Sequence, residues 1–186
     1  MLLACDIGNT RIKAGFFDEN VLTEYFCPNS LTHLIDRIEK ENIREIALSS
    51  VVPSLTRELE TSLSKFNLVP YIISRNSRFN LRINYDTPES LGVDRICSAE
   101  GAFFLHTSKN QFREKQIIIS VDFGTATTIN VVEYPGIFNG GIIAPGIDLM
   151  FKSLNSYTAQ LPLVFITDFK NTIVKSKGLG EWCPGF

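Results

Sequence analysis

The chain has 186 residues, a length that allows one ordinary domain or two small ones. Its 18 Lys and Arg residues nearly balance its 20 Asp and Glu residues, so it has no basic field with which to hold nucleic acid. A hydrophobic fraction of 44% and 14 Phe residues provide a packed core and exclude a disordered chain.

Strand, turn and strand are predicted at the start of the chain. LLACDIGNT has the pattern of a short buried strand that ends at an acid, and RIKAGFF alternates like a returning strand. This opening reaches Asp6 without a basic region or a long apolar stretch, so we expect no signal sequence and a cytoplasmic protein. Cys5 within the strand is expected to be an inert core thiol.

Two helices and another β-rich segment are predicted next. Ser30 can cap a helix whose apolar residues share one face, namely Leu31, Leu34, Ile35 and Ile38. EIALSSVV has a β-rich composition, and Pro53 begins a helix through about Phe66. The alternation of strands and helices predicts an α/β fold.

The following segments continue this alternation. LVPYIIS is predicted as a strand, LRI as a short extended piece in a polar loop, and residues 93–106 as a helix. QIIISVDF is the most apolar run, and TTINVVEY follows it with β-branched residues. YPGIFNGG is predicted as a turn, IIA as a strand, and IDLMFKSLNSYTAQL as a helix. From about Phe165 onward the sequence shows no clear periodicity.

The sequence supports neither a membrane-spanning helix nor a structural zinc site. The longest uncharged stretch, residues 134–147, is too short and too rich in glycine to span a bilayer as a helix, so we expect no membrane insertion. The four cysteines form no CxxC pair and have no histidine at ligand spacing, which argues against structural zinc.

A repeated motif is the most informative internal feature. DIGNT begins at Asp6 and DFGTA begins at Asp122, and each follows an apolar strand and precedes another extended segment. Gly8 lets the backbone approach an anion, Lys13 adds a positive charge, and Asp6 can face phosphates through a hydrated Mg²⁺. A single DxG is more often a simple hairpin turn, but two copies in matching contexts favour a nucleotide clamp.

A charged helix entrance lies at residues 92–95, Gly-Val-Asp-Arg. Arg95 could hold a carboxylate with two hydrogen bonds, and Asp94 could accept a proton from an attacking hydroxyl. The same four residues also fit a purely structural alternative, in which Asp94 stabilises the helix N-terminus electrostatically and Arg95 is a solvated surface charge. Neither a P-loop nor a GxGxxG motif occurs in the chain.

Four ordered motifs together resemble the bacterial type III pantothenate kinases, members of the superfamily of actin, acetate kinase and sugar kinases. The motifs are DIGNTRIK, NYDTPESLGVDR, DFGTATT and FNGGIIAPGIDLM, and the resemblance spans residues 1–163. It implies a duplicated ribonuclease H-like (actin-like ATPase) fold in two lobes, residues 1–115 and 116–186. Family members are commonly longer, so the second lobe is expected to be incomplete, with an atypical tail from about residue 165.

The resemblance also implies a reaction and its participants. The reaction is ATP-dependent phosphorylation of pantothenate to 4′-phosphopantothenate, the first step of coenzyme A biosynthesis, with Mg²⁺ and a monovalent cation, K⁺ or NH₄⁺. A homodimer is expected. The alternatives are an inactive shortened homologue that works as a nucleotide-binding or regulatory protein, and a kinase for another small alcohol.

Site residues follow from the resemblance by position. Asp94 is the expected catalytic proton acceptor, Asp6 the expected Mg²⁺ contact, and Asp122 the expected site of the monovalent cation. Contacts to ATP are expected from Asp6, Ile7, Gly8, Asn9, Thr10, Arg11, Ile12, Lys13 and Thr125. Contacts to pantothenate are expected from Tyr85, Gly92, Val93, Asp94, Arg95 and Thr172.

Overall fold

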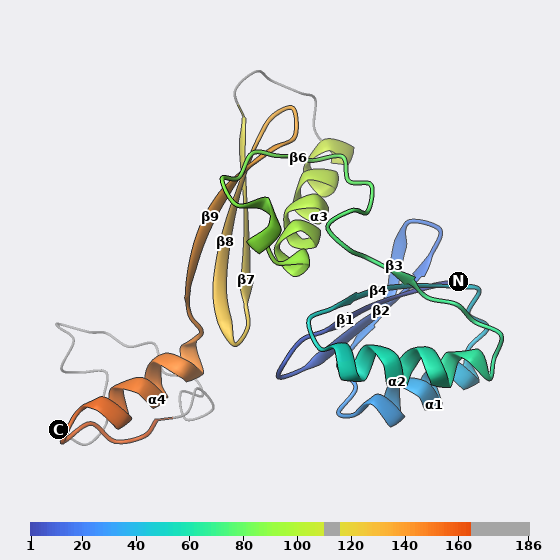
Figure 1. Cartoon of the computed structure of the whole chain (residues 1–186), viewed down its shortest axis with the longest axis horizontal. Coiled ribbons are helices and arrows are strands. Elements are labelled where there is room, and N and C mark those ends of the chain that lie inside the picture. The colour runs from blue at the N-terminus through green and yellow to red at the C-terminus, as the bar shows by residue number, and fades with distance from the viewer. Residues whose placement is uncertain (110–115, 165–186) are drawn as a thin grey trace. The chain divides into compact units, whose positions relative to one another are not determined.

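The computed structural model describes residues 1–109 and 116–164. They form a mixed α/β structure in which two sheets are combined with helices (Figure 1), which confirms the predicted α/β class. The chain divides into two compact units. One holds Met1–Asp122 with Thr128–Ile143, and the other holds Phe123–Thr127 and the described residues from Ala144 on.

A five-stranded sheet forms the N-terminal part of the first unit. Its order is β3-β2-β1-β4-β5, with β1 antiparallel to β2 and parallel to β4. The strands are β1 (Leu2–Ile7), β2 (Ile12–Asp18), β3 (Val21–Phe26), β4 (Glu45–Ser50) and β5 (Tyr71–Ile72). The predicted opening hairpin is confirmed. Sequence patterning missed β3, because this edge strand is exposed along nearly its whole length and shows no alternation.

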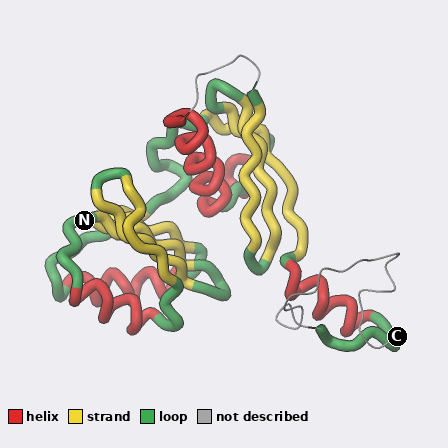
Figure 2. The backbone as a smooth tube through the Cα atoms, turned by 180° about the vertical axis from the view of Figure 1, so that it is seen from behind, coloured by secondary structure: helices red, strands yellow, loops and turns green. Residues whose placement is uncertain are grey.

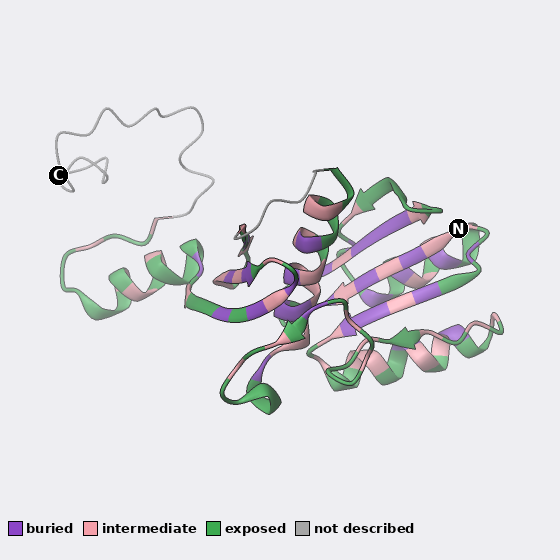
Figure 3. Cartoon of the chain, turned by 90° about the horizontal axis from the view of Figure 1, so that it is seen from above, coloured by how far each residue is buried: buried purple, intermediate pink, exposed green. Residues whose placement is uncertain are grey.

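Helices α1 (Leu31–Lys40) and α2 (Pro53–Ser64) lie on the same face of this sheet (Figures 1 and 2). The Oγ atom of Ser30 accepts a hydrogen bond from the His33 N–H at 3.1 Å, which confirms the predicted cap. Leu34, Leu59 and Leu63 are fully buried against the sheet residues Leu3 and Leu48. This core, visible as the buried stretches in Figure 3, fixes the strand ends that carry the first motif.

A four-stranded sheet of order β6-β9-β8-β7 packs against helix α3 (Val93–Lys109). Its strands are β6 (Arg82–Ile83), β7 (Ile117–Phe123), β8 (Ala126–Glu133) and β9 (Ile137–Pro145), and a short 3₁₀ helix, η1 (Pro88–Ser90), precedes α3. Only residues 124–125 separate β7 from β8, so these neighbours are antiparallel. Helix α3 also contacts β4 of the first sheet.

The turn predicted for residues 134–141 was too long, because β9 already begins at Ile137. Phe138 is fully buried, and its burial draws this segment into the sheet. Gly140 and Gly141 lie within the strand at φ values of 88° and 158°. A side chain at Gly141 would overlap the Ile129 carbonyl oxygen, so this glycine serves close strand pairing instead of a turn, whereas a side chain at Gly140 would meet the ring of Tyr85.

The order of elements repeats along the chain. Three strands and a helix, β1-β2-β3-α1, recur as β7-β8-β9-α4, in which α4 comprises Ile147–Tyr157. The sheet orders β3-β2-β1 and β9-β8-β7 match as well. The predicted sequence repeat therefore has a counterpart in the succession of elements. None of the helices described is long and apolar enough to cross a membrane.

Two cysteines are expected to resist alkylation at neutral pH. Burial raises the pKa of Cys5 to about 12 and that of Cys97 to about 11, so almost no thiolate is present at either residue. Cys27 is exposed and serves as the internal comparison. Mass spectrometry after brief iodoacetamide treatment of the folded chain should show Cys27 modified before Cys5 and Cys97. Equal labelling of Cys5 and Cys27 would contradict this expectation.

Candidate functional site

The turn between β1 and β2 carries a carboxylate and an ammonium group at its two ends. The antiparallel register sets Asp6 directly opposite Lys13. Between them, the Gly8 N–H donates a hydrogen bond to the Arg11 carbonyl oxygen at 3.0 Å and closes the turn. Both charged side chains therefore stand on one face of the hairpin, because opposed residues of neighbouring strands share a face.

The predicted ATP-binding run divides between core and surface. Ile7 and Ile12 are buried in the core of the first sheet, so only their backbone atoms are available at the turn. Asn9, Thr10 and Arg11 are exposed at its tip. The turn therefore offers amide, hydroxyl and guanidinium groups, which are donors suited to phosphate oxygens.

A cavity of about 510 Å³ opens beside this turn. It is lined by the turn, by the segment that leads into α1, and by one side chain of α2: Gly8, Asn9, Thr10, Arg11, Ile12, Cys27, Pro28, Asn29, Ser30, Leu31 and Leu55. Its volume lies in the range of small-ligand sites. Five residues of the predicted ATP-binding run thus line one hollow of the molecule.

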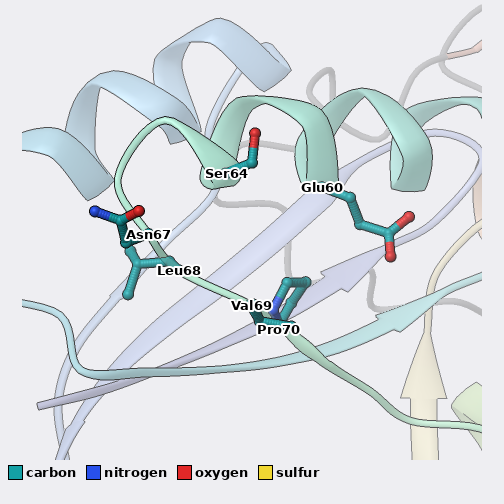
Figure 4. Close-up of a pocket in the computed structure, with 6 residues that line it drawn as sticks. All are labelled: Glu60, Ser64, Asn67, Leu68, Val69 and Pro70. Atoms are coloured by element: carbon teal, nitrogen blue, oxygen red, sulfur yellow. The ribbon is translucent and has the colours of Figure 1, made fainter.

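A second cavity, of about 350 Å³, lies at the end of α2 (Figure 4). Its lining comes from the last turns of α2 and the loop that follows: Glu60, Ser64, Asn67, Leu68, Val69 and Pro70. None of the predicted site residues belongs to it. We therefore do not assign this second cavity to the candidate functional site.

The two copies of the repeated motif meet through one ion pair. The Nζ atom of Lys13 lies 3.4 Å from the Oδ1 atom of Asp122, and both side chains are part-exposed. Lys13 belongs to the first motif, on β2, and Asp122 is the first residue of the second motif, on β7. Residues far apart in the sequence thus form one charged cluster.

Asp6 lies within electrostatic reach of two further carboxylates. Burial raises the pKa of the Asp6 carboxyl above its ordinary value, Lys13 lowers it, and the negative charges of Asp94 and Asp122 raise it further. The net shift is upward. Three predicted site carboxylates and one lysine therefore share a local field, although they come from β1, β2, α3 and β7.

Asp94 occupies the first turn of α3, as predicted. Its Oδ1 atom accepts a hydrogen bond from the Arg95 backbone N–H at 2.9 Å. A Cβ atom at Gly92 would overlap this same oxygen, so the glycine leaves the space that the carboxylate occupies. The Gly-Val-Asp-Arg sequence thus positions an oriented carboxylate at a helix start.

Arg95 is buried, with only 5% of its surface exposed, which excludes the alternative of a solvated surface charge. Its Nε atom donates to Asn130 Oδ1 at 2.8 Å, and its guanidinium lies over the Phe138 ring, 5.9 Å from the centroid. The ring of Tyr85 also packs against Phe138, with centroids 6.3 Å apart. Two predicted pantothenate contacts, Tyr85 and Arg95, therefore share one aromatic neighbour.

The second motif closes its turn within the second compact unit. The Gly124 N–H donates to Ala126 O at 3.0 Å, and the Gly146 N–H donates to Thr125 O at 2.9 Å. A side chain at Gly146 would overlap the Gly124 carbonyl oxygen. The predicted ATP contact Thr125 is thus held against the start of α4. Thr172, a predicted pantothenate contact, lies outside the described residues, as does the segment from residue 165.

A model of the family described as type III pantothenate kinase matches residues 2–177 of the chain. The chain belongs to the type III pantothenate kinase family. The matched range includes every predicted site residue, Thr172 among them, and extends beyond residue 163, where the resemblance in the sequence motifs ended.

Individual members of the type III pantothenate kinase family agree with this assignment. A protein of that name from Geotalea daltonii is 35% identical over 182 residues, which cover 90% of this chain and 68% of the relative. One from Agathobacter rectalis is 33% identical, covering 94% of this chain and 70% of the relative. One from Persephonella marina is 31% identical, covering 95% and 72%.

Sequence reasoning missed two residues that contact the predicted pantothenate-binding residues of this type III pantothenate kinase. Asn130 is fully buried on β8 and contacts Arg95, although TTINVV was interpreted only as a strand. Phe138, which joins Arg95 to Tyr85, was assigned to a turn. The one available signal was Asn130 itself, a polar residue in a run of apolar β-branched residues.

Proposed function

We propose that this chain transfers the γ-phosphoryl group of ATP to the terminal hydroxyl of pantothenate, giving 4′-phosphopantothenate, the first step toward coenzyme A. Membership of the type III pantothenate kinase family supports the reaction. The observation that carries it is the Lys13–Asp122 contact, because it gathers both motifs into the electrostatic neighbourhood of Asp6 and Asp94.

The chain's own residues account for positioning and charge. Phosphoryl transfer requires little covalent work from the protein, so in-line placement and neutralisation of negative charge dominate. The turn of residues 8–11 presents backbone N–H groups, hydroxyl and guanidinium donors to the phosphates. Lys13 adds positive charge beside them. Asp94 orients the attacking hydroxyl and accepts its proton, and Arg95 with Tyr85 holds pantothenate.

The residues present fit the metal ions that such a kinase uses. No group of three His, Cys, Asp or Glu side chains is close enough to cage a metal in the described part of the chain. Mg²⁺ needs no such cage, since it is usually held by one or two carboxylates together with waters and substrate phosphates. Asp6 would hold it, and bound Mg²⁺ neutralises phosphate charge. Asp122, whose side chain is 48% exposed, has room for a monovalent cation, K⁺ or NH₄⁺.

The wider architecture forms part of the proposal. The repeated order β-β-β-α supports a duplicated ribonuclease H-like fold in two lobes, residues 1–115 and 116–186. We infer a cytoplasmic homodimer from the family resemblance. No observation favours the regulatory alternative or a kinase for another alcohol.

A direct assay tests this proposal. The purified chain is incubated with ATP, Mg²⁺ and pantothenate in K⁺ or Na⁺ buffer, and mass spectrometry follows 4′-phosphopantothenate while a coupled assay follows ADP. We expect equal amounts of both products, formed faster in K⁺. ADP release without phosphopantothenate, or preference for another small alcohol, would contradict the assignment.

Gly92→Ala is expected to lower kcat by about tenfold to a hundredfold and to leave the fold intact. The new Cβ would overlap Asp94 Oδ1, and the carboxylate is the part that can move, so the proton acceptor is displaced. Gly101→Ala is the matched control, because Gly101 lies in α3, the helix that begins after Gly92, and a Cβ at Gly101 would meet nothing within 4 Å. Equal kcat values for the two variants, measured beside their thermal melts, would contradict this role of Gly92.

A further inference from the structure

Arg95 is a buried cation without an acidic partner among the described residues. The ion pairs of that part of the chain join other residues: Lys13 with Asp122, and Arg37 with Glu24 and Glu41. The Nη2 atom of Arg95 is buried and makes no hydrogen bond within the described residues. Such an arrangement is unfavourable unless something else supplies an acceptor, since an unpaired buried charge is costly.

Within the described ranges, the single side-chain acceptor of Arg95 is the neutral amide of Asn130. Asn130 Oδ1 accepts from Arg95 Nε at 2.8 Å. The other end of the amide is also engaged, because Asn130 Nδ2 donates to Ser120 Oγ at 3.2 Å. Ser98 of α3 donates to the same Ser120 oxygen at 3.2 Å. The amide therefore has one favoured orientation, with its oxygen toward Arg95.

The hydrogen bonds of Asn130 and the ring of Phe138 together restrict the position of the Arg95 guanidinium. Asn130 holds its Nε edge, and Phe138 lies against its face. Both partners are fully buried, so neither has room to move aside. A guanidinium fixed at one edge and one face keeps Nη2 in a constant position, with its donors unused by any residue that the structure describes.

We propose that Asn130 is the positioning residue of the pantothenate site, which fixes Arg95 through Nε so that Nη2 donates to an oxygen acceptor of bound pantothenate. This inference rests on the proposed function, in which Arg95 contacts pantothenate. Asn130 acts only through Arg95 and does not touch the reacting atoms.

Two substitutions separate the acceptor from the volume of the side chain. Asn130→Leu removes the acceptor and keeps a similar size, and Asn130→Asp keeps an oxygen in the same place. We expect Asn130→Leu to raise the KM for pantothenate by about tenfold or more with an unchanged KM for ATP, as for a lost hydrogen bond to a charged group. Asn130→Asp should restore the KM. If leucine prevents folding, the smaller Asn130→Ala carries the same test.

Val132→Ala is the matched control for damage to the core, because Val132 is a fully buried residue on the same strand, in the same core cluster. It should lower the melting temperature without a change in the KM for pantothenate. An equal rise in KM for Val132→Ala and Asn130→Leu would overturn the positioning role.

A second readout is independent of turnover. In NMR spectra of the chain with isotope-labelled arginine, the Arg95 Nε–H should exchange slowly in the wild type and in Asn130→Asp, and rapidly in Asn130→Leu. If the Arg95 Nε–H exchanges slowly and the KM for pantothenate is unchanged in Asn130→Leu, the role of Asn130 is overturned while the proposed function stands. A wild-type chain that does not phosphorylate pantothenate would overturn the proposed function, and with it the substrate named here.

Discussion

Asp94→Asn is expected to lower kcat for pantothenate phosphorylation by about 10² to 10⁴-fold, the usual worth of a positioned general base. Asparagine retains an oxygen that can accept the Arg95 backbone N–H, so the helix start keeps its geometry. The amide cannot accept the proton of the attacking hydroxyl. The substitution therefore removes the proton acceptor and preserves the geometry of the helix start. Steady-state kinetics with saturating ATP would measure the loss of kcat.

Glu89→Gln is the matched control for this substitution. Glu89 is an exposed acid in the short helix η1, immediately before α3, so its replacement removes a nearby negative charge without touching the site. Its kcat should equal that of the wild type. An Asp94→Asn chain that turns over at the wild-type rate would remove Asp94 from the mechanism.

Asp6→Asn is expected to lower kcat by about a hundredfold or more, because the carboxylate proposed to hold Mg²⁺ beside the phosphates is lost. The same substitution should not destabilise the fold at neutral pH. Burial raises the pKa of Asp6, which means that the folded state disfavours the charged carboxylate. Replacement by a neutral amide removes that unfavourable charge.

The pH dependence follows from the sign of this shift. Between the ordinary aspartate pKa and the raised pKa of folded Asp6, the folded chain binds more protons than the unfolded chain. The contribution of Asp6 to the free energy of unfolding of the wild type therefore falls as pH rises through this window. Relative to the wild type, Asp6→Asn should gain stability across the same window and show no difference below it.

Denaturant unfolding of both chains at a series of pH values measures this difference. Lys13 remains paired with Asp122 in the variant, so a gain in stability would not come from a new ion pair. Parallel curves for the two chains, or a variant that loses stability as pH rises, would show that the pKa of Asp6 is not raised in the folded state.

Local signals in the sequence predicted most of the elements. Ser30 capped α1 and Pro53 began α2, because each acts on the backbone of its own first turn. Edge strand β3 was missed, since pairing with β2 alone defines it and its side chains stay exposed. The start of β9 was misplaced because a glycine that allows close strand pairing, such as Gly141, resembles a turn glycine in the sequence.

The candidate site was predictable in parts but not as an assembly. Repetition of the DxG motif indicated that Asp6 and Asp122 belong together, yet the contact that joins the motifs runs through Lys13, which only folding brings to Asp122. Arg95 in isolation looked like a surface charge. Its burial depends on Asn130 and Phe138, which are distant in sequence, and no local pattern encodes such a contact.

The Lys13–Asp122 pair also makes the two copies of the repeat unequal. Ile129 stands where the first motif has Lys13, so the second copy contributes a carboxylate but no ammonium group. The first copy therefore supplies a carboxylate, Asp6, and the ammonium group of Lys13, whereas the second copy supplies only the carboxylate of Asp122 that pairs with Lys13. Exchanging the two copies within the chain would leave their charges on the wrong strands. The duplicated architecture is therefore directional, because the first copy alone supplies a cation and the second copy supplies its acidic partner.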